Sequence, residues 1–214
     1  MESKDNCITD PDIIEASRPF LIHQVIATIA FLVISVLLKL MSDEMSVKTT
    51  VIYEDLLKDD CLSTTLHDLH VAFLISAGIM LTGLVIALIM RFSTEIRSDS
   101  NLSPSKAIKG VIVFLYIMAV AVSADPVYMT ILVMTREPEI TALEISDKDF
   151  ESARRGPTLY YYVVIGYGEE LTVPRSIYNS IDPGSSYYLI SYNGHIVKAY
   201  DCSVYTLKYD PSDN

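Results

Sequence analysis

The sequence predicts three membrane-spanning helices followed by a small all-β domain, either a barrel or a sandwich. Two apolar runs, residues 20–41 and 69–90, are each long enough to cross the ~30 Å hydrocarbon core of a bilayer as a helix. A third apolar run begins near residue 108, and the residues after 126 are rich in tyrosine and β-branched side chains, as strands are. The predicted organisation is therefore a tail over 1–19, a membrane region over 20–126 and a β-domain over 127–209, with 210–214 as a second tail.

The first run, residues 20–41, contains a single charge, Lys39, near its end. The tail before it is acidic, whereas a signal peptide begins with basic residues, and no suitable cleavage site follows the run. We therefore expect an uncleaved membrane anchor. His23 and Gln24 lie within one turn of its start, where polar groups either reach the lipid headgroups, bond to another helix or serve a function.

The second run, residues 69–90, contains no charged residue and follows an acidic connection over 42–68. Gly78 and Thr82 are small residues four positions apart, as are Gly83 and Ala87. This spacing lets helix backbones approach closely. Packing within the chain and packing between copies of the chain are both open from the sequence.

The third span is predicted over about 108–125, and its end is set by Asp125 and Pro126. A residue before proline avoids the α conformation, so we expect the helix to end at Ala124 and Asp125 to lie in an exit turn. If the helix instead continued past Pro126, Asp125 would be a buried carboxylate beside a kink, which is typical of a transport site.

The connection between the second and third spans is the one with basic character, from Arg91, Arg97, Lys106 and Lys109. Short basic connections stay in the cytoplasm, so we expect a cytoplasmic N-terminus and a β-domain on the outer side of a cell membrane. Three spans place Cys61 and Cys202 in the same compartment. In an oxidising compartment these thiols are candidates for a disulfide, and the alternative is two unrelated, partly buried side chains.

In the β-domain the clearest unit is a hairpin over residues 186–200. Asn193-Gly194 suits a type I′ turn, in which both central residues need positive φ, and the flanks are strand formers. Short strands in so short a segment favour a barrel or sandwich, and 148–158 between them is expected to be a loop or a short helical turn. The further expected strands are 127–135, 140–146, 159–166, 170–174 and 203–209.

Residues 160–207, with the segments YYYVVIG, IYNSIDPGSSYYLISYNGHIVKAY and VYTL, resemble the C-terminal domain of small uncharacterised bacterial multi-helix membrane proteins. In that family a few helices precede a β-domain of OB-like or SH3-like type. The resemblance implies a membrane-anchored β-module. It implies no activity, and no catalytic residue is carried over from it.

Residues of reactive type are few and scattered. His67 and His70, with Cys61 nearby, are weak candidates for metal ligands, because no established ligand spacing such as HExxH or CxxC accompanies them. Phosphate-binding loops and nucleophile motifs are absent from the sequence, so we expect no catalytic residue and no cofactor. A net charge of −11 argues against nucleic acid as a partner.

The expected function is therefore non-enzymatic. A membrane-anchored protein would present its Tyr-rich β-domain at the membrane surface to bind another protein, an envelope polymer or a second copy of itself, since tyrosine offers a large contact area with a polar tip. The alternative is an oligomeric small transporter or channel subunit that uses His23, Gln24 and Asp125 in its spans. The simpler interpretation of the tyrosines is that most of them pack within the β-domain and have no binding role.

Overall fold

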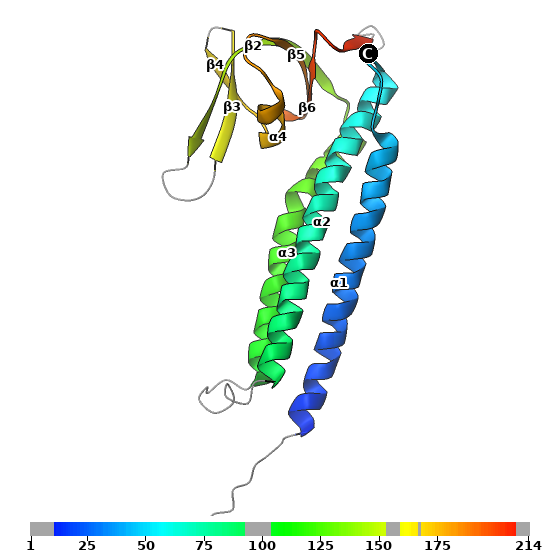
Figure 1. The fold of residues 1–214 in the computed structure, drawn as a ribbon, viewed down its shortest axis with the longest axis vertical. Coiled ribbons are helices and arrows are strands. Elements are labelled where there is room, and N and C mark those ends of the chain that lie inside the picture. The colour runs from blue at the N-terminus through cyan, green and yellow to red at the C-terminus, as the bar shows by residue number, and fades with distance from the viewer. Residues whose placement is uncertain (1–10, 93–103, 153–158, 167, 209–214) are drawn as a thin grey trace, which may run out of the picture. The chain divides into compact units, whose positions relative to one another are not determined.

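The structure, a computed structural model, describes residues 11–92, 104–152, 159–166 and 168–208 (Figure 1). Its helical part consists of α1 (Pro11–Met45), α2 (Glu54–Phe92) and α3 (Pro104–Thr135). Over the described residues, three helical stretches are long and apolar enough to cross a membrane: Leu21–Met45, Glu54–Ile89 and Lys109–Thr135. The three predicted apolar helices are confirmed, and each extends beyond the apolar run that predicted it.

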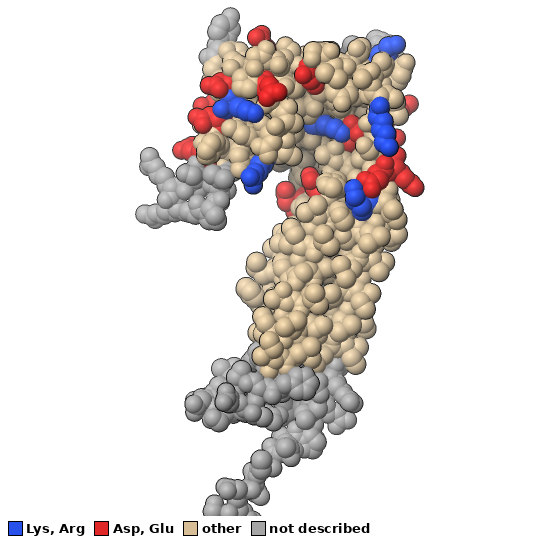
Figure 2. All heavy atoms as spheres, viewed as in Figure 1, with Lys and Arg blue, Asp and Glu red and all other residues tan. Residues whose placement is uncertain are grey.

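The chain divides into two compact units. The helical unit comprises Met1–Leu37 and His70–Asp125, and the mixed unit comprises Leu38–Leu69 and Pro126–Asn214. The mixed unit therefore joins the C-terminal strands to helix ends from all three long helices. In Figure 2 the apolar runs present an uncharged surface, whereas lysine, arginine, aspartate and glutamate side chains gather over the strands and the adjoining helix ends.

A five-stranded antiparallel sheet follows the helices, with strand order β4-β3-β2-β5-β6. Its strands are β2 (Glu139–Ser152), β3 (Leu159–Ile165), β4 (Glu169–Thr172), β5 (Ser186–Tyr192) and β6 (His195–Asp201). The central strand β2 pairs with β5 through its first half and with β3 through its second half, and the register shifts between Ile145 and Asp147. Within the described residues no closed barrel is found, so the predicted barrel or sandwich is not confirmed, whereas the C-terminal sheet region is.

The predicted hairpin over 186–200 is present as β5 and β6. Asn193 and Gly194 have φ values of 52° and 77°, which are the left-handed values that a type I′ turn requires. A register shift between Ile190 and Ser191 leaves an extra residue on β6. Lys198 then lies opposite Ile190 and projects on the same side of the sheet.

The β5–β6 hairpin is buried on both faces. One face packs in the sheet core with helix α4 (Arg175–Ser180), and the other packs on the helix ends in what we call the helix-end core. The alternation of side chains along β5 sends Leu189 into the sheet core and Ile190 into the helix-end core. The sheet core comprises Ile145, Val163, Val173, Ile177, Ile181, Tyr187, Leu189 and Ile196. The helix-end core comprises Ile52, Leu57, Cys61, Leu132, Val133, Ile190, Tyr192, Val197 and Tyr200.

The structure corrects the predicted end of the third helix. Helix α3 continues to Thr135 with Pro126 inside it, so residues 127–135 are helical rather than a strand, and Asp125 is an exposed helical residue rather than part of a turn. The β-branched composition of 127–135 suggested a strand, but Leu132 and Val133 pack into the helix-end core, and this tertiary contact favours helix. Asp125 is not the buried carboxylate of the alternative interpretation either.

Several smaller predictions also change. Residues 148–152 belong to β2 rather than to a loop, and α4 was not foreseen. Of the strand predicted over 203–209, β7 (Thr206–Lys208) is present, and it pairs in parallel with β1 (Val51–Tyr53) from the connection between the first two spans. The predictions for the two tails at 1–10 and 210–214, and for 153–158, fall outside the described residues.

Candidate functional site

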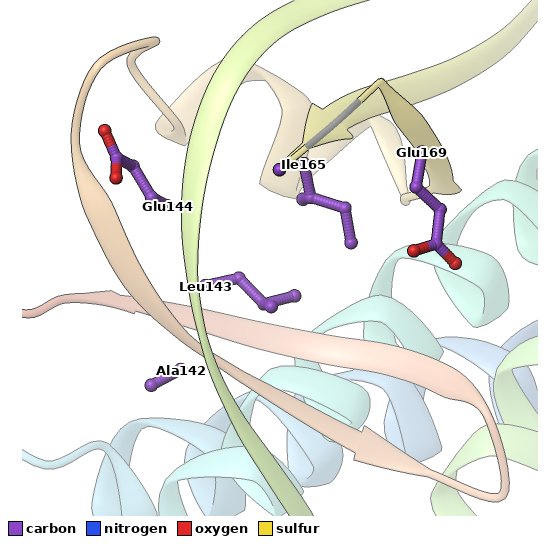
Figure 3. A pocket seen from close by; sticks show the side chains of 6 residues that line it. Ala142, Leu143, Glu144, Ile165 and Glu169 are labelled. Atoms are coloured by element: carbon purple, nitrogen blue, oxygen red, sulfur yellow. The ribbon is translucent and has the colours of Figure 1, made fainter.

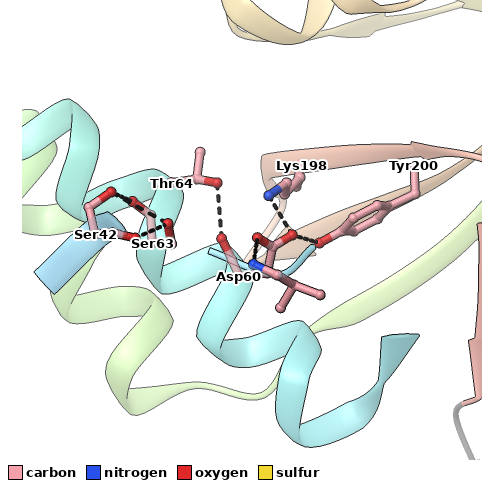
Figure 4. Close-up of polar contacts among 7 residues, drawn as sticks. Ser42, Asp60, Ser63, Thr64, Lys198 and Tyr200 are labelled. Carbon is pink, nitrogen blue, oxygen red and sulfur yellow. Dashed lines mark hydrogen bonds and ion pairs between the residues drawn. The ribbon is translucent and has the colours of Figure 1, made fainter. Parts of the chain in front are cut away.

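A buried carboxylate joins helix α2 to strand β6. The Asp60 side chain is 5% exposed, and its Oδ2 accepts hydrogen bonds from Lys198 Nζ at 2.5 Å and from the Tyr200 hydroxyl (Figure 4). The backbone N–H of Val47 donates to Oδ1 at 3.1 Å. We call these four residues the Asp60 cluster. Because the partners of the buried charge come from the connection after α1 and from β6, the cluster fixes the helix ends against the sheet within the mixed unit.

The Asp60 cluster also sets the protonation of Tyr200. Burial raises the pKa of the Tyr200 hydroxyl far above its usual range, and the hydrogen bond to Asp60 adds to the increase. The phenol therefore keeps its proton and remains a hydrogen-bond donor through neutral and mildly alkaline pH. Burial also raises the pKa of the nearby Tyr192 hydroxyl.

A polar pocket of about 330 Å³ lies beside this cluster, and we call it the hydroxyl pocket. Two reciprocal hydrogen bonds join two of its lining residues: Ser42 Oγ donates to the carbonyl of Ser63 at 2.9 Å, and Ser63 Oγ donates to the carbonyl of Ser42 at 2.7 Å. In Figure 4, Thr64 lies between this serine pair and Lys198. The lining residues are Ser42 and Asp43 of α1, Ser46 directly after it, Ser63, Thr64, His67 and Asp68 of α2, Ser176 of α4 and Lys198 of β6.

An aromatic ladder follows the β2–β3 pair onto α4. The ring centroids of Phe150 and Tyr161 are 6.5 Å apart, and those of Tyr161 and Tyr178 are 5.0 Å apart. Two cations accompany the rings: Lys148 Nζ lies 5.1 Å from the Tyr178 ring, and the Arg175 guanidinium lies 6.0 Å from the Tyr161 ring. Phe150 is 55% exposed, whereas Tyr161 and Tyr178 are half-buried against the sheet core, so the ladder runs from the edge of that core to the surface.

A second hollow, of about 380 Å³, lies between β2 and the turn that joins β3 to β4 (Figure 3). Glu144 and Glu169 stand on either side of it, with Leu143 and Ile165 between them. The lining residues of this hollow include two carboxylates but no cation and no nucleophile. They therefore do not form a reactive centre.

The weak metal candidates do not come together. Cys61 is buried in the helix-end core, and His67 is exposed at the hydroxyl pocket. His70 belongs to the helical unit, where its Nδ1 lies 2.8 Å from Ser35 Oγ. Among the residues that the structure describes, no group of three or more metal-ligating side chains is found.

Cys61 and Cys202 are both free thiols, so the disulfide considered from the sequence is not formed in the structure. Cys61 faces the core side of the sheet beside Tyr192, and Cys202 is half-buried beside Tyr188. Burial raises the pKa of the Cys202 thiol, which lowers its nucleophilic character.

The three polar candidates predicted within the membrane spans, His23, Gln24 and Asp125, lie in different environments. Gln24 is fully buried, and its Nε2 donates to the carbonyl of Met80 on α2 at 2.9 Å, which is the interhelical hydrogen-bonding role. Its Oε1 has no hydrogen-bond partner among the described residues. His23 and Asp125 are exposed on α1 and α3. The three side chains therefore do not form one site within a single chain.

Sequence reasoning missed the Asp60 cluster and the hydroxyl pocket. Asp59 and Asp60 are adjacent and chemically identical, yet Asp59 is exposed and Asp60 is buried. The available signal was the alternation of Lys198 and Tyr200 along β6, which places both on one face of the strand.

The chain matches no protein-family model, and comparisons with curated proteins and with solved structures found no match. The resemblance of residues 160–207 to bacterial membrane-protein tail domains therefore stays a prediction.

Proposed function

We propose that this chain is a multi-pass membrane protein that presents its sheet region for binding at the membrane surface, without catalysing a reaction. Three helices of sufficient length and apolarity support the membrane assignment. The basic residues between α2 and α3 favour a cytoplasmic N-terminus and a sheet region on the outer side of a cell membrane. The partner is another protein or a second copy of the chain.

The observation that carries the proposal is the aromatic ladder. Phe150 is 55% exposed and lies directly opposite Tyr161 on the neighbouring strand, and exposed aromatic side chains on a surface are typical of interaction sites. Lys148 and Arg175 place two positive charges there, in a chain whose net charge is −11. Aromatic residues and arginine are the types enriched where protein interfaces are strongest.

Some tyrosines pack the cores of the sheet region, and others are available at its surface for binding. Of those described in the sheet region, Tyr187, Tyr192 and Tyr200 are buried and serve the two cores. The binding surface is thus smaller than the tyrosine content suggests. It consists of Phe150, Tyr161 and Tyr178 with their two cations.

Photo-cross-linking from the ladder tests this proposal. With a benzoyl-phenylalanine photo-cross-linker in place of Phe150, we expect discrete cross-linked species in intact cells, detected by gel mobility and mass spectrometry. The matched control carries the same group in place of Val204, which is 53% exposed but lies away from the ladder. Equal yields from both positions, or no product from position 150, would contradict a specific surface.

The alternative function is an oligomeric transporter or channel subunit. It is favoured by one observation: His23 and Asp125 are exposed on helices that present mostly apolar side chains, where a polar group gains from an oligomer partner. Three helices alone hardly enclose a path, so this function requires several copies.

The mass of the detergent-solubilised protein decides between these functions. A mass close to a monomer of 23.9 kDa plus bound detergent in light scattering would count against the transporter, because that function requires several copies. A stable oligomer that the Asp125→Asn substitution dissociates would instead favour the transporter, and exposed Asp43→Asn serves as the control substitution.

A further inference from the structure

The hydroxyl pocket lies where two predicted membrane spans meet the aqueous phase. Ser42 and Asp43 directly follow the apolar run that ends at residue 41, and His67 and Asp68 directly precede the run that begins at residue 69. A pocket at the ends of two spans is level with the lipid headgroups of a bilayer. This step rests on the membrane placement in the proposed function.

The pocket carries charges of both signs. Asp43 and Asp68 supply carboxylates, and Lys198 supplies an ammonium group. The Asp43 contact with Lys39 joins two exposed side chains, with 58% and 42% exposure, so it is a weak pair that a ligand can replace. Lys198 gives one hydrogen bond to Asp60, and an ammonium has three donors, so the side chain retains donors for an anion.

We propose that the hydroxyl pocket binds phosphoethanolamine, as the headgroup of a phospholipid. The phosphate takes the side of Lys198 and the hydroxyl of Ser176, while the primary ammonium takes the side of Asp43. Asp43 lies on α1 and Lys198 lies on β6, so the carboxylate and the cation reach the pocket from different elements. A volume of about 330 Å³ is at the lower end of the range of small-ligand pockets, which suits a group of this size.

The same chemistry discriminates against other headgroups. A choline group is a quaternary ammonium with no N–H, so it cannot donate a hydrogen bond to Asp43. A glycerol headgroup has no cation, so Asp43 would face only its anionic phosphate. An ethanolamine lipid alone satisfies both ends of the pocket among these three.

The helix surface next to the pocket is suited to the rest of a lipid. On α1, the turn that precedes the pocket residues exposes Leu40 and Met41, with 57% and 46% exposure. Apolar side chains at this position offer contact for acyl chains, whose burial is favourable in proportion to apolar area.

Native mass spectrometry of the full chain in detergent, titrated with lipid, tests the inference. We expect phosphatidylethanolamine to bind about tenfold more tightly than phosphatidylglycerol or phosphatidylcholine, the ratio that one charged hydrogen bond supplies. Asp43→Asn should remove most of this preference. Asp59→Asn is the matched control, because Asp59 is an exposed carboxylate near the start of α2 that does not line the pocket.

The outcomes separate the inference from the function that it rests on. Equal affinity for the three lipids, or an equal loss in Asp43→Asn and Asp59→Asn, overturns the headgroup site. Soluble phosphoethanolamine is a further arm of the titration, and binding as tight as that of the lipid would overturn the lipid source. A chain that stays soluble without detergent overturns the membrane placement itself, whereas the cross-linking from position 150 depends on neither lipid nor pocket.

Discussion

Replacing Asp60 with alanine is expected to lower the free energy of unfolding of the mixed unit by about 3 kcal/mol, near the lower end of the range for breaking a buried ion pair. The substitution leaves Lys198 without its carboxylate and removes the acceptor of the Tyr200 hydroxyl and of the Val47 N–H. The lower end applies because the Lys198 side chain is 28% exposed and reaches water through the hydroxyl pocket.

Cys61 supplies the readout for this experiment. It is fully buried in the helix-end core, so a thiol-reactive dye labels it only when that core opens. In a background with Cys7→Ser and Cys202→Ser, Cys61 is the remaining cysteine of the three. The labelling rate, measured as a function of temperature or denaturant, then reports the opening of the mixed unit.

Two further variants isolate the charge. Asp59→Ala changes an exposed neighbour on the same helix and is expected to leave the labelling curve unchanged, because exposed charges contribute little. The double variant Asp60→Ala with Lys198→Met removes both charges and should regain part of the lost stability. Identical curves for the two alanine variants would mean that the Asp60 cluster does not hold the helix ends against the sheet.

The β5–β6 hairpin shows what the sequence can predict. Asn193-Gly194 is a local signal, because the turn needs positive φ at two consecutive residues and few residue pairs adopt it readily. The apolar runs of the helices are local signals of the same kind, since length and the absence of charge are visible in the residues themselves. The hairpin was predicted with nearly correct bounds, whereas each helix was predicted too short.

The features that depend on distant partners were not predictable. Residues 51–53 form a strand only because 206–208 lie beside them, and residues 127–135 stay helical because they pack against α2 and the sheet within the helix-end core. The same holds for the candidate site. Asp60 differs from Asp59 only because it lies on the face of α2 that contacts Lys198 and Tyr200. The position of these two side chains depends in turn on the bulge in β6.

The helical unit has its own test at Gly83, where α2 approaches α3 and α1. A Cβ atom added at Gly83 would lie 2.0 Å from Leu115 Cδ1 and 3.4 Å from Gln24 Nε2. Overpacking of this kind costs about 1–3 kcal/mol, and the gain in helix propensity from Gly to Ala returns about 1 kcal/mol. We therefore expect Gly83→Ala to destabilise the helical unit by up to about 2 kcal/mol, measured as the loss of helical circular dichroism during titration with a denaturing detergent.

Gly78 is the matched control, because it lies on the same helix, is exposed and has no atom within 4 Å of an added Cβ. Gly78→Ala should leave the unfolding midpoint unchanged or raise it, so the difference between the two variants isolates the overpacking. Adding Leu115→Ala to Gly83→Ala removes the obstructing side chain and should recover part of the loss. If Gly78→Ala proved the more damaging variant, the glycine at position 78 would face another copy of the chain. That result would support the oligomeric transporter.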